Sequence, residues 1–211
     1  MASGRPETAR AYAEAARAAG VAFINTTSDP VARDPHLLDR FEAAGLPLLG
    51  DDLASQFGTS VLHNALLRLL AERGLTLVSS YQVNLGGTED FRNLVDNPNT
   101  KKQSKLNALS ADHAVDRPAV DRPAGGRVEV APLGYLPHLN SHKVAHLNIE
   151  AQGWGGTAVS LDVKLRVDDP AGAAGVNIDL IRIAASALRH GHGGCSAEAT
   201  SLLKSPPGTA V

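Results

Sequence analysis

Two lysines in a polar segment, residues 88–110, have a spacing that could do chemistry. Lys101 and Lys105 are four positions apart. If residues 99–109 are helical, this spacing puts both ammonium groups on one face, about one turn apart. Such groups repel each other unless an anion or carboxylates compensate them, and they suit a phosphate as point charges. The pattern is compatible with an anion site and also with a solvated polar face.

Two further lysines stand at the ends of expected elements. Lys143 comes at the start of a segment with strand-like alternation. Lys204 ends the last expected helix, just before Pro206 and Pro207. Lysine side chains are seldom fully buried, so each of these two would, taken alone, be an ordinary surface residue.

Acidic residues also follow the expected strands. Asp51 and Asp52 come after the apolar run 46–49, and Asp168 and Asp169 close a later strand. At the carboxyl end of a parallel strand, a carboxylate suits a ribose hydroxyl or a reacting hydroxyl. The structural alternatives are a helix cap for the first pair and a turn for the second.

The sequence contains no metal-ligand spacing of a standard type and none of the common catalytic motifs. The candidate metal ligands are His190, His192 and Cys195, and His138, His142 and His146. The first group has no standard zinc spacing, and Pro137 with the strand pattern argues against a helical ligand face for the second. No G-x-G-x-x-G, P-loop, G-x-S-x-G or H-E-x-x-H motif occurs, and no metal site is expected.

The first part of the chain alternates helices with short apolar runs. Helices are expected over 6–19 and 34–44, and strand-length runs over 21–25 and 46–49. This order predicts a parallel α/β sheet, which binds ligands at the carboxyl ends of its strands. A strand at 75–85 is expected to end this part.

A long amphipathic helix is expected over 59–73, before that strand. Its apolar stripe consists of Leu62, Leu66, Leu69 and Leu70. Leucines at this spacing lie on one side of a helix and predict the side that packs against the core.

The second part has a different pattern. Strands begin near Val128, and the segments 145–150 and 159–168 alternate apolar with polar residues. Period-two alternation is typical of antiparallel sheet with one buried face. A helix is expected over 173–189 and a short final helix over 196–204. The tandem Val-Asp-Arg-Pro-Ala repeat at 115–124 predicts a surface loop.

Composition bounds the partners and the compartment. The net charge is −2, and aromatic residues make up 4% of the 211 residues, which argues against nucleic acid and anionic membranes as partners. One cysteine excludes an internal disulfide. We expect no apolar run long enough to span a bilayer and no signal peptide, and therefore a cytoplasmic protein.

Five segments, in chain order, resemble the myo-inositol-phosphate synthase family, particularly its actinobacterial members. They are 50–56 (GDDLASQ), 81–91 (YQVNLGGTEDF), 100–105 (TKKQSK), 169–179 (DPAGAAGVNID) and 203–207 (LKSPP). Each is weak alone, but together they span nearly residues 5–207.

The resemblance implies both a fold and an activity. The expected fold is α/β: a partial Rossmann-like parallel sheet over 1–85, an α+β domain with a mainly antiparallel sheet over 86–190, and a C-terminal segment, 191–211, that returns to the active site. The implied enzyme is an NAD-dependent isomerase, an inositol-3-phosphate synthase, which converts D-glucose 6-phosphate to 1D-myo-inositol 3-phosphate. It does so by oxidation, enolisation, aldol cyclisation and reduction, and serves inositol and phospholipid biosynthesis. The family implies a homotetramer.

The resemblance also implies roles for individual residues. Lys101 and Lys204 would polarise the reacting oxygens, and Lys105 and Lys143 would serve the phosphate and proton relay. Asp169 would orient a catalytic lysine. The cofactor contacts implied by the resemblance are Asp52, Ser55, Asp90 and Lys101.

The sequence departs from the family in three ways. Ala54 replaces a common lysine, and Ser141 stands where an aspartate is usual. The family's opening strand, glycine-rich loop and helix have no counterpart, so an N-terminally truncated member is expected. Two alternatives stay open: an inactive homologue that acts as an interaction or regulatory subunit, and a relative that performs another NAD-linked carbocyclisation.

Overall fold

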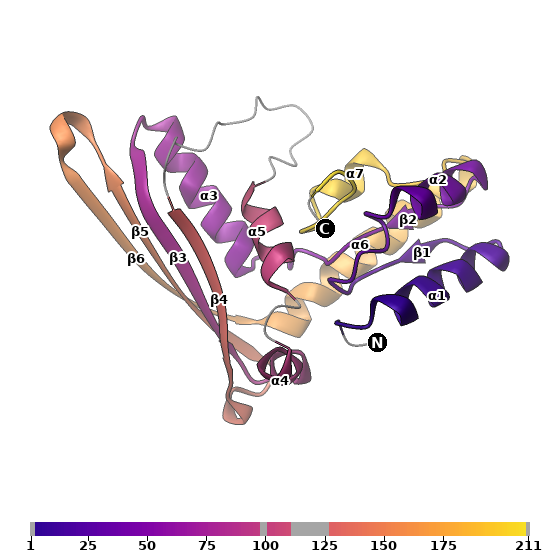
Figure 1. Ribbon diagram of the computed structural model, residues 1–211, viewed down its shortest axis with the longest axis horizontal. Helices are drawn as coiled ribbons and strands as arrows, with labels where there is room; N and C mark the ends of the chain where they lie inside the picture. The colour runs from indigo at the N-terminus through magenta and orange to yellow at the C-terminus, as the bar shows by residue number, and fades with distance from the viewer. Residues whose placement is uncertain (1–2, 98–100, 111–126, 210–211) are drawn as a thin grey trace.

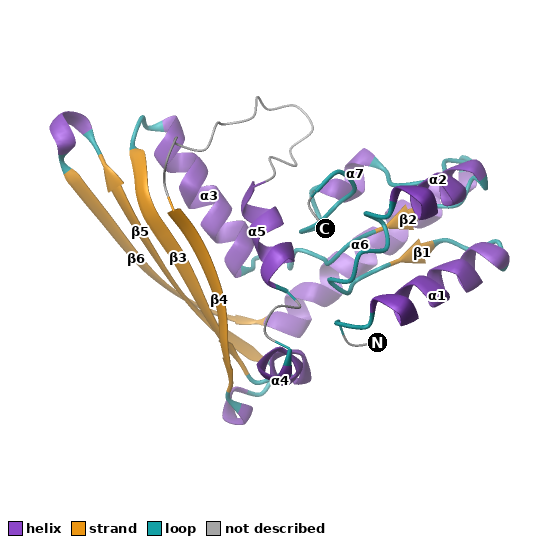
Figure 2. Cartoon of the chain, in the orientation of Figure 1, coloured by secondary structure: helices purple, strands orange, loops and turns teal. Residues whose placement is uncertain are grey.

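The computed structural model describes residues 3–97, 101–110 and 127–209. Its elements form two groups, a long curved sheet with helices on one face and a small two-stranded sheet among the other helices (Figure 1). Figure 2 shows the long strands of the first group in orange beside the mostly helical second group. The tandem repeat at 115–124 lies outside the described residues.

The second group contains the first part of the chain, which has the expected alternation, together with α6 (Asp169–Arg189) and the C-terminal segment. The elements of the first part are α1 (Pro6–Ala18), β1 (Phe23–Ile24), α2 (Pro35–Ala43) and β2 (Leu48–Leu49), and the two strands pair in parallel. A proline lies in the first turn of each helix, and the Asp34 side chain caps α2 by accepting from the amides of His36 and Leu37. The parallel α/β start is therefore confirmed.

The larger sheet has four strands in the order β4-β3-β5-β6. They are β3 (Thr76–Gly86), β4 (Arg127–Tyr135), β5 (His142–Gln152) and β6 (Ala158–Asp168). The pair β3–β4 is parallel, while β3–β5 and β5–β6 are antiparallel. The expected fold class, a small parallel sheet followed by a mainly antiparallel one, is confirmed. The assignment of β3 to the parallel part was wrong, because β3 pairs only with strands of the larger sheet.

Helix α3 (Thr59–Glu72) packs on this sheet with most of the expected stripe. Leu70 is buried and Leu66 packs against the same cluster, but Leu69 is 50% exposed and Leu67 is buried instead. The reason is a polar contact in the interface. His63 is buried, and its two ring nitrogens contact the Gln82 and Ser80 side chains of β3. The spacing of the leucines alone did not predict that the side of the helix with His63 faces the sheet.

Three shorter elements surround the end of the sheet. Helix α4 (Glu89–Asp96) was not expected, and α5 (Lys102–Ser110) lies where the 99–109 helix was predicted. Helix α7 (Ala197–Thr200) covers only part of 196–204. Short 3-10 turns occur at Pro137–Leu139 and Trp154–Gly156.

Helix α6 (Asp169–Arg189) connects the two groups. It follows β6 directly, begins earlier than expected because Asp168 caps it at the Ala171 amide, and packs on β1, β2 and α7. By length and composition α6 could cross a membrane, which corrects the expectation that no such segment exists. One side of α6 is buried, where Val176, Leu180 and Ala184 pack in a cluster with Leu49 and Leu203, whereas Ile178 and Ile181 are 59% and 58% exposed.

Candidate functional site

The C-terminal segment returns to the end of β2 and brings Lys204 with it. Asp51 and Ser205 exchange backbone hydrogen bonds of 2.7 and 3.0 Å, and the Lys204 amide donates to the Asp52 carbonyl at 2.7 Å. Leu53 and Leu203 form an antiparallel bridge beside them. This ladder places a lysine from the end of the chain at the carboxyl end of a parallel strand.

Asp52 joins this segment to α5. Its carboxylate accepts from the Lys204 ammonium at 3.1 Å and from the Ser104 hydroxyl at 2.6 Å. Burial would raise the pKa of Asp52, but the charges of Lys204 and Lys101 outweigh it and hold the pKa below its usual value. Asp52 is therefore a carboxylate whose two oxygens are both engaged within the protein.

Asp51 is turned away from this cluster and holds a loop together. Its buried carboxylate accepts from the Asn25 side chain at 2.7 Å, from the Ala32 amide at 2.9 Å and from the Arg33 guanidinium at 3.1 Å. These contacts bring the ends of β1 and β2 together through hydrogen bonds that leave no acceptor open to a ligand. Of the adjacent aspartates, only Asp52 faces the lysines.

Two other lysines have carboxylate partners. Lys143, at the start of β5, donates to Asp169, at the start of α6, at 2.5 Å, and Lys101 donates to Asp90 of α4 at 2.7 Å. Burial lowers the pKa of Lys143, and Asp169 offsets only part of that effect. Burial also opposes the charge of Lys101, but Asp52 and Asp90 raise its pKa. Lys101 therefore stays protonated at neutral pH.

Lys105 differs from the other three lysines. It lies on α5, is 8% exposed, and has no carboxylate within ion-pair distance among the residues that the structure describes. Burial lowers its pKa to about 7, and the charges of Lys143, Lys204 and Lys101 contribute to the same shift. Near neutral pH its amine exchanges readily between the neutral and charged forms.

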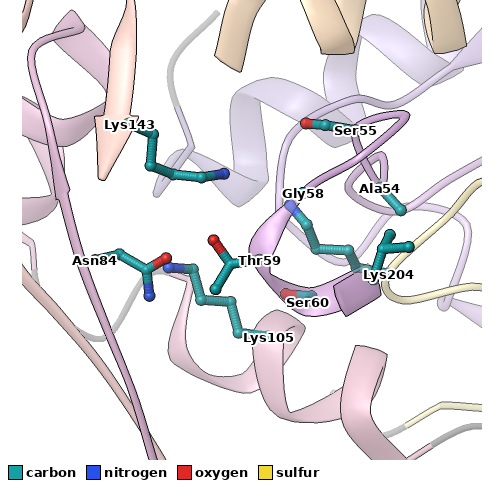
Figure 3. Close-up of a pocket in the computed structure, with 10 residues that line it drawn as sticks. Ala54, Ser55, Gly58, Thr59, Ser60, Asn84, Lys105, Lys143 and Lys204 are labelled. Atoms are coloured by element: carbon teal, nitrogen blue, oxygen red, sulfur yellow. The ribbon is translucent and has the colours of Figure 1, made fainter. Parts of the chain in front are cut away.

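Three ammonium groups point toward one cavity (Figure 3). Lys105, Lys143 and Lys204 line it together with Asn84 of β3 and the beginning of α3. Its enclosed volume is about 20 Å³, room for one water-sized group. The remaining lining residues are Ala54, Ser55, Gly58, Thr59, Ser60 and Val61.

Two side chains that line this cavity have buried polar atoms without a hydrogen-bond partner in the described chain. The Thr59 hydroxyl and both amide atoms of Asn84 are buried without a hydrogen-bond partner there. Gly58 precedes α3 and gives it no side-chain cap. A helix N-terminus with free amides attracts an anion, so this cavity combines three lysine amino groups, unpartnered donors of the described chain and a helix end in one place.

The structure thus brings most of the predicted residues together. Lys105, Lys143, Lys204 and Ser55 line the cavity, while Asp52 and Asp169 hold two of its lysines. Lys101 and Asp90 form a pair outside the lining. Thr59, Asn84 and Ser104 also belong to the site, but no motif in the sequence predicted a role for them. A signal for Asn84 existed in the alternation of β3, where Ser80, Gln82 and Asn84 put polar side chains on the buried face.

Comparison with known proteins points to the family that the sequence resembles. The family model described as Myo-inositol-1-phosphate synthase matches residues 58–170. The inositol-3-phosphate synthase of Corynebacterium glutamicum is 37% identical over 97% of this chain and 57% of its own length. That of Mycolicibacterium smegmatis is 35% identical, with 97% and 56% coverage. The chain therefore spans just over half the length of these curated relatives.

Solved structures agree in fold. Ari2, whose crystal structure is known, has 57% sequence identity with this chain and a TM-score of 0.78, and the match covers 99% of this chain and 56% of that chain. A myo-inositol-1-phosphate synthase-related protein from Thermotoga maritima is 25% identical with a TM-score of 0.75, covering 95% and 51%. The Caenorhabditis elegans inositol-3-phosphate synthase is 21% identical with a TM-score of 0.77, covering 96% and 42%, a likeness of fold alone.

Proposed function

Because the chain belongs to the myo-inositol-1-phosphate synthase family, we propose that it serves the conversion of D-glucose 6-phosphate to 1D-myo-inositol 3-phosphate. The reaction consists of NAD-linked oxidation, enolisation, aldol cyclisation and reduction. The observation that carries the proposal is the convergence of Lys105, Lys143 and Lys204 on one cavity with unsatisfied polar groups. This arrangement suits a phosphorylated sugar whose oxygens become negatively charged during the reaction.

The phosphate has a natural place at the beginning of α3. Lys105 and Lys143 supply positive charge, and the uncapped first turn of α3 supplies backbone amides beside the Thr59 hydroxyl. Charge-assisted hydrogen bonds of this kind are roughly twice as strong as neutral ones. The phosphate would thereby fix the position of the sugar carbons.

The remaining lysines suit the reacting oxygens. An enolate and a ring-closing alkoxide each develop negative charge, and a preorganised cation there lowers the barrier. Lys204 is held by Asp52, and Lys101 by Asp90, so both ammonium groups are fixed in position before substrate binds. Asp169 fixes Lys143 in the same way.

Lys105 suits proton transfer as well as phosphate binding. A general acid or base works best when its pKa is close to the operating pH. Burial and the three neighbouring cations lower the pKa of Lys105 to about 7. Its ammonium can therefore give a proton to the substrate and recover it at a later step.

We propose NAD as the cofactor, which supplies hydride transfer when bound. Asp90 fits the edge of such a site, because its side chain is 39% exposed and only one oxygen bonds to Lys101. The other oxygen is open to a ribose hydroxyl. Ser55 lines the cavity. Asp52 has both oxygens engaged and would act through Lys204. A dinucleotide needs contacts beyond these residues.

Substrate binding requires movement at the cavity. A volume of about 20 Å³ holds one water-sized group, far less than a hexose phosphate. The Lys105 side chain is the movable wall, because its flexible four-carbon stem has no carboxylate partner in the part of the chain that the structure describes. We propose that the sugar phosphate displaces this side chain, while Lys143 and Lys204 stay with their carboxylates.

Calorimetric titration with glucose 6-phosphate tests the proposal. We expect the parent chain to bind it, Lys143→Met to weaken binding about tenfold or more, and the exposed Lys102→Met to leave it unchanged. Phosphorus NMR of a mixture with NAD should then detect inositol phosphate. Absence of glucose 6-phosphate binding by the parent chain would overturn the proposal. Binding without turnover would favour a non-catalytic interaction or regulatory subunit.

A second candidate is a relative that performs another NAD-linked carbocyclisation. The chain is 57% identical to Ari2 and 37% identical to the Corynebacterium glutamicum inositol-3-phosphate synthase, so its similarity is not confined to proteins named as inositol-3-phosphate synthases. Titration with the aldose and ketose isomers of glucose 6-phosphate discriminates the two: tighter binding of an isomer than of glucose 6-phosphate itself would favour this second function.

Two further properties are proposed from the family resemblance. These are assembly as a homotetramer and a cytoplasmic location. Light scattering coupled to size-exclusion chromatography measures the first directly, and a mass of one chain in solution would contradict it.

A further inference from the structure

Three of the four lysines around the cavity form ion pairs with carboxylates of the described chain, and the fourth does not. Lys101, Lys143 and Lys204 each donate to a carboxylate of their own, from Asp90, Asp169 and Asp52. Lys105 has no such partner among the described residues. A proton on Lys105 therefore adds uncompensated positive charge to a buried site.

Charges from four parts of the chain bear on the proton of Lys105. Lys101 precedes α5, Lys143 comes from β5, and Lys204 from the C-terminal segment, and all three disfavour a further cation. Asp52, after β2, favours it, but Ser104 and Lys204 already occupy its oxygens. With burial, these charges lower the pKa of Lys105 to about 7.

The same cavity offers an anion a place to bind. The Thr59 hydroxyl and the Asn84 amide are buried without partners in the described chain, and the uncapped start of α3 faces the same space. An anion bound there would bring negative charge to the ammonium of Lys105. That charge would replace the missing carboxylate and favour the protonated amine.

We infer that Lys105 is the proton acceptor of this cavity: above neutral pH its amine is mostly neutral while the cavity is empty, and it becomes an ammonium when an anion binds. One proton from solvent is thereby taken up with each anion. The inference rests on the proposed function, because both need an anion among these lysines. It adds that phosphate binding and proton uptake are a single event at this residue.

Calorimetry of the parent chain with inorganic sulfate tests the inference. Sulfate stays a dianion across the range used, so its own protonation does not contribute. At pH 8, titrations in two buffers of different ionisation enthalpy should give an uptake close to one proton per sulfate. Between pH 7.5 and 9 the affinity should fall by up to about tenfold per pH unit.

Variants at Lys105 isolate the residue. Lys105→Arg keeps a permanent charge, so sulfate should still bind, with no proton uptake and a flat pH dependence. Lys105→Met should weaken binding and also abolish the uptake. The control Lys102→Met removes an exposed lysine from the same helix and should keep the parent's uptake.

The outcomes separate this inference from the proposed function. If the parent chain binds sulfate without proton uptake, the inference is overturned while the anion site stands. Uptake that persists in Lys105→Met would assign the proton to another group and overturn it too. If neither sulfate nor glucose 6-phosphate binds the parent, the inference and the proposed function both fail.

Discussion

At the scale of single residues, the two neighbouring aspartates after β2 have opposite uses. Asp51 and Asp52 have the same side chain and nearly the same burial. Asp51 binds the loop that contains Arg33, whereas Asp52 binds Lys204 and Ser104. Residue type and spacing predicted a polar strand end. Which carboxylate would reach the lysines depended on the direction of the chain at Asp52, whose φ is 54°.

Asp52→Asn should destabilise the protein by about 2–4 kcal/mol, because it leaves the Lys204 ammonium without its charged partner in a mostly buried site. Urea unfolding at pH 7 measures this loss. Asp179→Asn is the exposed control, since Arg182 and Asp179 are 78% and 54% exposed and their pair should contribute about 1 kcal/mol or less. Equal losses in the two variants would contradict the role given to Asp52.

Lys105 should make stability depend on pH. Its pKa is about 7 in the folded chain, against an ordinary value of 10.5. Between these values the unfolded chain binds a proton that the folded chain lacks, so the free energy of unfolding rises with pH. In Lys105→Met this contribution is absent, and the variant should be more stable than the parent at pH 7.

Urea unfolding of both proteins at pH 7, 8 and 9 checks this. The stability advantage of Lys105→Met should shrink by about 1 kcal/mol per pH unit, and taking the difference cancels the titration of shared groups. Lys102→Met controls for loss of an exposed lysine. An advantage that is independent of pH would contradict a neutral Lys105.

At the scale of elements, α5 and the C-terminal segment act as one unit. Asn107 of α5 donates to the Ser205 hydroxyl at 3.1 Å, and both side chains are buried. Ser104, one turn earlier, and Lys204 share the Asp52 carboxylate. The separation of the Lys105 and Lys204 ammonium groups is therefore set by this contact between a helix and a returning strand-like segment.

Asn107→Ala should loosen that contact. We expect a loss of about 1–3 kcal/mol, because the Ser205 hydroxyl is left buried without this donor. Hydrogen exchange of the Lys204 and Ser205 amides should speed up more than that of amides in α3. Asn97→Ala removes an exposed side-chain bond at the end of α4 and should change neither quantity appreciably.

At the scale of the whole molecule, the site lies where the two groups of elements meet. β2 and the C-terminal segment belong to one group, while β5, α3 and α5 belong to the other. Helix α6 joins them, with Asp169 at its first turn holding Lys143 of β5. The division into domains at residues 85 and 190 stays a prediction, but the cavity needs residues from both sides of each boundary.

Leu203→Ala should therefore weaken the molecule well beyond its own segment. Leu203 is 2% exposed and packs in the cluster that contains Leu49 and Leu180. Truncation of a buried leucine costs about 2–5 kcal/mol. The measured quantity is the free energy of unfolding in urea, compared with Leu69→Ala on the exposed side of α3, for which we expect a change of about 1 kcal/mol or less. Similar losses would mean that the C-terminal segment does not anchor the core.

Much of the local structure was determined by sequence alone. Prolines, glycines and the Asp34 cap set the limits of α1 and α2, and alternation along β5 predicted its buried face, because these features depend on neighbours in the chain. In β6 the same alternation separates half-buried from exposed side chains. Five ordered segments identified the family, which the comparisons confirm. The individual roles of the lysines stay predictions.

Only the tertiary structure decided which polar groups meet. It placed β3 in the larger sheet, turned His63 into the α3 interface, and left Asn84 and Thr59 unsatisfied beside Lys105. Pairing between strands and packing of helix faces join residues far apart in sequence, so no local pattern specifies them. The charge state of Lys105 follows from the same cause: its spacing from Lys101 is local, but the cations that surround it come from distant parts of the chain.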